Sequence, residues 1–84
     1  MPVLSRFYGI IIRMYFQQAE HNPPHIHALY GDDMAAIDIK TGKILEGGLP
    51  PKALSMVREW INTNEKELLH IWETQEFKAL PPLE

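Results

Sequence analysis

The proline pair at 50 and 51 divides the sequence into a part with strand character and a part with helical character. Proline is well tolerated in the first turn of an α-helix, because the N–H group that it lacks would have no partner within the helix. We therefore expect a helix to begin here. Before the prolines, four segments are rich in β-branched and aromatic residues or alternate between apolar and polar residues, as strands do. These predicted strands span about 7–16, 25–30, 34–40 and 43–46.

After the prolines, apolar residues recur at helical spacing. The stripe consists of Leu54, Val57, Ile61, Leu68 and Trp72. The sequence Asn-Thr-Asn at 62–64 is a poor helix former, so we expect either two helices, about 51–62 and 64–75, or one broken helix. Residues 76–84 are expected to form an extended tail.

With 84 residues, the chain is long enough for one domain that buries a modest core. The order of its elements predicts an α+β domain over 1–84, in which an antiparallel four-stranded sheet is followed by helices packed on one of its faces. The last two strands meet at a turn around Gly42. We expect this glycine to be left-handed in a bulged three-residue turn, which pairs Ile37 with Leu45 and places both on the buried face.

Strand alternation predicts which polar side chains gather on the opposite face, because successive residues of a strand point to opposite sides. If Ile26 and Ala28 point toward the helices, His25 and His27 point away from them. The same reasoning applied to the neighbouring strands completes the helix-free face. Its predicted members are Arg13, Tyr15, His25, His27 and Asp38.

The composition excludes several classes of protein. Hydrophobic residues make up 45% and charged residues 23% of the chain, as in ordinary soluble domains. The absence of cysteine excludes disulfides, cysteine zinc sites and thiol catalysis, and it suits a reducing cytoplasm. The net charge of −3 and the scattered Lys and Arg residues argue against nucleic acid as a partner. The N-terminal sequence does not resemble a signal peptide, and no apolar run is long enough for a membrane span, so we expect a cytoplasmic protein.

The segment His21-Asn22-Pro23-Pro24-His25-Ile26-His27 carries three of the four histidines. Imidazole is a common metal ligand and titrates near neutral pH. His25 and His27 lie two apart on a predicted strand, so both side chains can reach one ion. With His21 from the loop, and with Asp38 or Glu20 as an oxygen ligand, they form a candidate site for zinc or another divalent transition metal.

Two other interpretations of the histidines stay open. His25 and His27 could transfer protons while Arg13 stabilises an oxyanion, which is the chemistry of a metal-independent ribonuclease. Alternatively, the rings have a structural or partner-binding role, in which each packs and makes one hydrogen bond.

The sequence also resembles a family of small bacterial proteins, the domain of unknown function 4160. The resemblance is carried by Ser5-Arg6-Phe7-Tyr8-Gly9-Ile10, by the histidine segment through Tyr30-Gly31, and by Leu49-Pro50-Pro51 with Trp60 and Trp72. It implies a cytoplasmic bacterial protein, but no established activity and no assigned catalytic residues. Genes of this family often lie beside those of another small family, the domain of unknown function 2442, an arrangement that suggests a toxin–antitoxin pair.

These observations predict a binding or interaction component of a two-gene, toxin–antitoxin-like system, with a histidine-centred surface site. The alternative is a ribonuclease-like toxin, or a metal-binding protein, that uses His25 and His27. An unpaired edge strand in so small a domain would also permit a homodimer through strand pairing.

Overall fold

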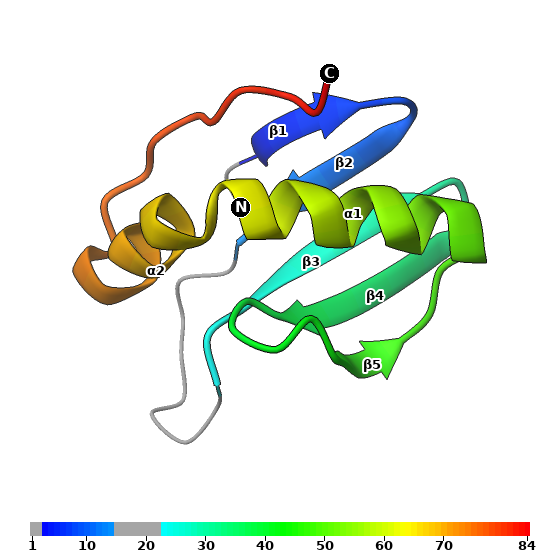
Figure 1. The fold of residues 1–84 in the computed structure, drawn as a ribbon, viewed down its shortest axis with the longest axis horizontal. Helices are drawn as coiled ribbons and strands as arrows, with labels where there is room; N and C mark the ends of the chain where they lie inside the picture. The colour runs from blue at the N-terminus through cyan, green and yellow to red at the C-terminus, as the bar shows by residue number, and fades with distance from the viewer. Residues whose placement is uncertain (1–2, 15–22) are drawn as a thin grey trace.

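The computed structural model describes residues 3–14 and 23–84, and these form an antiparallel sheet followed by two helices. The strands are neighbours in chain order, from β1 to β5, as Figure 1 shows. Their bounds are Val3–Phe7 for β1, Ile10–Arg13 for β2, His25–Tyr30 for β3, Asp33–Asp38 for β4 and Ile44–Gly47 for β5. Helix α1 spans Pro51–Thr63 and α2 spans Glu65–Thr74.

The sheet has five strands and not the predicted four, because the segment expected to form one strand contains a turn. Tyr8 has a φ of 50° and Gly9 has a φ of 80°. Two successive positive φ values are the signature of a type I′ turn, which joins antiparallel strands tightly. The turn pairs Phe7 with Ile10, so the residues before it form β1. Of the predicted strand over 7–16, positions 15 and 16 lie outside the described residues.

The hairpin between β4 and β5 differs from the prediction in the position of its bulge. Gly42 is left-handed as expected, with a φ of 75°. However, Ala36 pairs with Glu46 while Ile37 pairs with Ile44, so Leu45 is an extra residue on β5. The predicted pairing of Ile37 with Leu45 is therefore wrong, and Leu45 is 44% exposed instead of buried.

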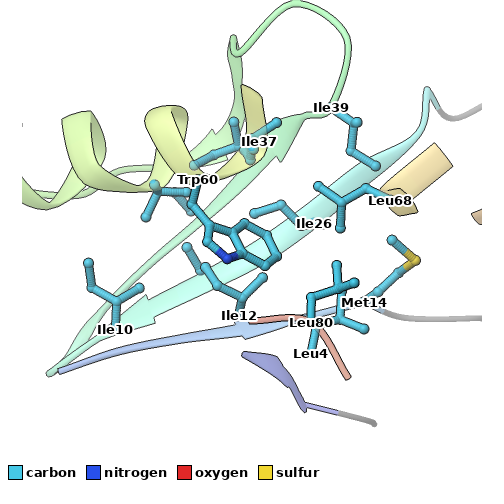
Figure 2. Close-up of a cluster of buried hydrophobic side chains, with 14 of the residues drawn as sticks. Leu4, Ile10, Ile12, Met14, Ile26, Ile37, Ile39, Trp60, Leu68 and Leu80 are labelled. Carbon is cyan, nitrogen blue, oxygen red and sulfur yellow. The ribbon is translucent and has the colours of Figure 1, made fainter. Parts of the chain in front are cut away.

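One face of the sheet forms the core with α1, which crosses it (Figure 1). The buried sheet residues on this face alternate along the strands, as the pleat requires. On β2, β3 and β4 they are Ile10, Ile12, Ile26, Ala28, Ala35 and Ile37. Figure 2 shows the indole of Trp60 between Ile12, Ile26 and Ile37, with Leu68 of α2 and Met14 to one side of it.

The helical region consists of two helices, which resolves the alternative left open by the sequence. Asn64 separates them with a φ of −111°, outside the helical range. Its backbone N–H donates to the carbonyls of Trp60 and Ile61, and its side-chain amide donates to the carbonyl of Trp60. Asn64 therefore satisfies two of the last four carbonyls of α1 and lets α2 begin in a new direction. No helix among the described residues is long and apolar enough to cross a membrane.

The C-terminal tail is extended as predicted, but it is also part of the core. Leu80 is buried, and its backbone N–H donates to the carbonyl of Leu4 at 2.8 Å. The indole N–H of Trp60 donates to the carbonyl of Pro81, also at 2.8 Å. The tail thus lies beside β1 and packs against α1 (Figure 1).

Candidate functional site

His25 and His27 lie on the face of the sheet that is opposite to the core. The residues between and after them, Ile26 and Ala28, are fully buried in the core. The histidine rings pack edge to face, with their centroids 5.2 Å apart. We call this surface the histidine face; its described members are Arg13, His25, His27, Ala36 and Glu46. Four of them, Arg13, His27, Ala36 and Glu46, are register partners in one row across β2 to β5.

The His25 ring is oriented by its own loop. Its Nδ1 lies 2.8 Å from the carbonyl oxygen of Pro23. Because a carbonyl oxygen can only accept, Nδ1 carries the proton and donates it. In the neutral ring, Nε2 then has a free lone pair, which can accept a hydrogen bond, take up a proton or bind a metal.

Helix α2 reaches the histidine face at this end of the sheet. The indole of Trp72 lies against the His25 ring, with 5.1 Å between the centroids. The face is therefore not free of helices over its whole length, as alternation alone had suggested. The ring of His25 therefore contacts both Trp72 and His27.

His27 lies deeper than His25. Its ring is buried, and this loss of contact with water lowers the pKa of His27 below the ordinary value of histidine. The neighbouring His25 lowers the pKa further, and the carboxylate of Glu46 opposes both effects. The fold therefore favours the neutral form of His27.

A recess of about 230 Å³ opens beside His25. Ala36 lines the recess from β4, the strand between β3 and β5. A side chain larger than that of alanine would fill part of the recess. The described residues that line it are Pro23, His25, Ala36, Leu45 and Glu46.

The bulge in β5 builds one wall of this recess. Bulges redirect side chains and are frequent beside functional sites. Without an extra residue, Leu45 would pair with Ile37 and point into the core. With it, Leu45 lies at the recess beside Glu46.

Not all of the predicted site residues come together. Asp38 is the register partner of His25, but its Oδ1 accepts the backbone N–H groups of Lys40 and Thr41 and so stabilises the turn. Arg13 is the register partner of His27 and is half-buried, and its Nε is buried without a hydrogen-bond partner among the described residues. His21, Tyr15 and Glu20 lie outside the described residues.

The predicted metal site can be examined only in part. Within residues 3–14 and 23–84, no three His, Asp or Glu side chains are placed to hold one ion. His25 and His27 are the two described members of the predicted set that lie in contact.

Three residues of the site were not identified from the sequence. Leu45 was missed because its place depends on the bulge. The place of Glu46 does not, since the predicted pairing of Ile37 with Leu45 already implies that Glu46 lies opposite Ala36, as it does. Trp72 was assigned to the apolar stripe of the helices, and no local pattern connects it with a residue 47 positions earlier in the chain.

A larger hollow, of about 410 Å³, lies at the other end of β3. It is lined by the exposed rings of Tyr8 and Tyr30 and by the first turns of α1. Lys52 is its one charged side chain among the described residues, and no histidine or carboxylate lines it there. The recess beside His25 is therefore the better candidate for chemistry, despite its smaller size.

Comparison with known families gives one match. The family described as Domain of unknown function (DUF4160) matches residues 9–73. The matched part contains the histidine segment, strands β2 to β5, helix α1 and nearly all of α2. No curated protein and no solved structure matches the chain.

Proposed function

The chain belongs to the DUF4160 family, and from this premise we propose that it is a binding component of a small two-protein system, with the histidine face as its contact surface. The resemblance noted in the sequence suggests the partner: the product of an adjacent gene of the domain of unknown function 2442. The partner would dock on β3, β4 and β5, where the recess lies.

The observation that carries the proposal is the bulge at Leu45. A buried position on β5 would have suited this leucine as a core residue, yet the extra residue turns it to the surface. An exposed leucine beside a recess offers apolar area that a protein partner can bury. Strand β5 pairs with β4 on one side, and its other edge pairs with no strand among the described residues. This open edge lies directly beside Leu45.

A copurification experiment tests the proposal. The chain is expressed together with the product of the adjacent gene, and the dissociation constant of the complex is measured for Leu45→Asp and for Phe77→Asp. The two side chains make a matched pair, since they are 44% and 49% exposed and lie in different parts of the fold. We expect Leu45→Asp to weaken the complex by about tenfold or more and Phe77→Asp to leave it nearly unchanged. Equal effects, or no complex with the unaltered chain, would reject the proposal.

A second candidate function rests on the hydrogen bond between His25 and Pro23. Fixing Nδ1 by a backbone carbonyl is also how proteins orient a histidine that binds a metal or acts as a general base. On this reading His25 and His27 bind zinc or act in a ribonuclease-like toxin. Stoichiometric metal in the purified protein that is lost in His25→Ala would support the metal site. Growth inhibition that is unchanged in His25→Ala and His27→Ala would exclude catalysis by these residues.

A further inference from the structure

Among the described residues, the polar side chains that line the recess act as hydrogen-bond acceptors. Glu46 contributes a carboxylate, which accepts hydrogen bonds and donates none. His25 has already committed its Nδ1 proton to Pro23, so that Nε2 of the neutral ring is also an acceptor. A ligand that satisfies both the carboxylate of Glu46 and Nε2 of His25 must therefore donate hydrogen bonds.

The other side chains that the described part of the chain contributes to the lining are apolar. Leu45, Pro23 and the methyl group of Ala36 offer surface to a hydrocarbon chain but no hydrogen bond from a side chain. A volume of about 230 Å³ is below the range of roughly 300–1,000 Å³ that holds a drug-sized molecule. The recess thus has room for one side chain, which must combine an apolar stem with a polar end.

Charge favours a cation over the alternatives. An anion would meet the carboxylate of Glu46, and a purely apolar side chain would remove that carboxylate from water without replacing its hydrogen bonds. The chain as a whole carries a net charge of −3, which attracts a basic surface.

We propose that the recess binds an arginine side chain of the protein partner, with the guanidinium on Glu46 and its stem on Leu45 and Pro23. Arginine suits the recess better than lysine, because its planar group can form two parallel hydrogen bonds with a carboxylate and still has further N–H groups that can donate to Nε2 of His25. This inference rests on the proposed function, since it names the chemistry of the group that the partner inserts.

A titration with small probes tests the inference without the partner. The ¹⁵N-labelled chain is titrated with N-acetyl-arginine amide, and the amide signals of Ala36, Leu45 and Glu46 are followed by NMR. We expect saturable shifts at these positions, with a dissociation constant on the order of millimolar. N-acetyl-citrulline amide, which has nearly the same shape but no charge, should bind several-fold more weakly, and N-acetyl-lysine amide should fall between the two.

Variants locate the binding. Glu46→Gln removes the carboxylate and should raise the dissociation constant for the arginine probe by about threefold or more. Glu59→Gln is the matched control, because Glu59 is an exposed residue of α1 that lies outside the recess. Equal binding of the citrulline and arginine probes, an equal effect of both variants, or shifts confined to other surfaces would overturn the inference. Failure of the probe with an intact protein complex rejects the arginine site alone, whereas loss of the complex with a working probe rejects the proposed partner.

Discussion

The imidazole of His25 contacts the imidazole of His27 edge to face, at a centroid distance of 5.2 Å. His25 is half-buried and held by Pro23 and Trp72, whereas His27 is buried behind it. Two positive charges at this distance repel each other in a partly dry environment. The neighbouring His25 therefore disfavours the protonated form of His27.

The first prediction concerns the pH dependence of stability. Burial, and then His25, lower the pKa of His27 in the folded chain. In the unfolded chain the ring takes up a proton near pH 6.5, so that below about this pH the unfolded state binds more protons than the folded one. The contribution of neutral His27 to the free energy of unfolding is thus complete above this range and is lost as the pH falls toward the lowered pKa.

Urea denaturation at several pH values between about 7.5 and 5 checks this prediction. His27→Gln should lose less stability over the range than the unaltered chain, since its side chain does not titrate. His70→Gln serves as the control, because His70 is exposed on α2. If the free energy of unfolding changes with pH in the same way for the unaltered chain and for His27→Gln, His27 does not titrate differently in the folded and unfolded states, and the prediction is wrong.

The second prediction compares two adjacent glycines after the bulge. Gly47 has a φ of 74°, and a Cβ at this position would collide with the carbonyl oxygen of Met34. Gly47→Ala should therefore reduce the free energy of unfolding by at least about 2 kcal/mol, from backbone strain and the collision together. At Gly48 a Cβ would meet no described atom within 4 Å. Gly48→Ala should therefore change the free energy of unfolding by less than about 0.5 kcal/mol. Equal effects of the two substitutions in denaturant unfolding would contradict the geometry of β5.

The third prediction concerns the tail. Leu80 is buried against the core and its N–H binds the carbonyl of Leu4. Leu80→Ala should reduce the free energy of unfolding by about 2–4 kcal/mol, as for other buried leucines. Phe77→Ala, at an exposed position of the same tail, should reduce it by less than about 0.5 kcal/mol. Thermal unfolding of both variants measures the difference. A tail that contributes nothing to stability would give the same small effect for both.

The sequence predicted the fold best where one pattern determined the structure. The alternation of β3 correctly separated His25 and His27 from Ile26 and Ala28, because the buried face of a strand has a strict period of two. The proline pair correctly marked the start of α1, and the weak helix formers around Asn64 correctly marked the division into two helices.

Prediction failed where several conformations satisfy the same local pattern. Tyr8 is an unusual residue for a left-handed turn position, which asparagine, aspartate or glycine usually occupies. The predicted strand over 7–16 therefore ran through the turn, and residues 3–6 of β1 were assigned to no strand. The bulge at Leu45 is set by the packing of β5 on β4, and turn residues alone do not determine it. The contact of Trp72 with His25 is tertiary, and no periodicity within either segment predicts it.

Hydrogen–deuterium exchange of the chain, alone and in complex with the product of the adjacent gene, tests most directly whether the histidine face is the contact surface. If the histidine face is the contact surface, amides of His25–Tyr30 and Ile44–Gly47 should exchange more slowly in the complex, and those on the exposed side of α1 should not change. Protection that is confined to α1, or to the hollow at Tyr8 and Tyr30, would contradict the account.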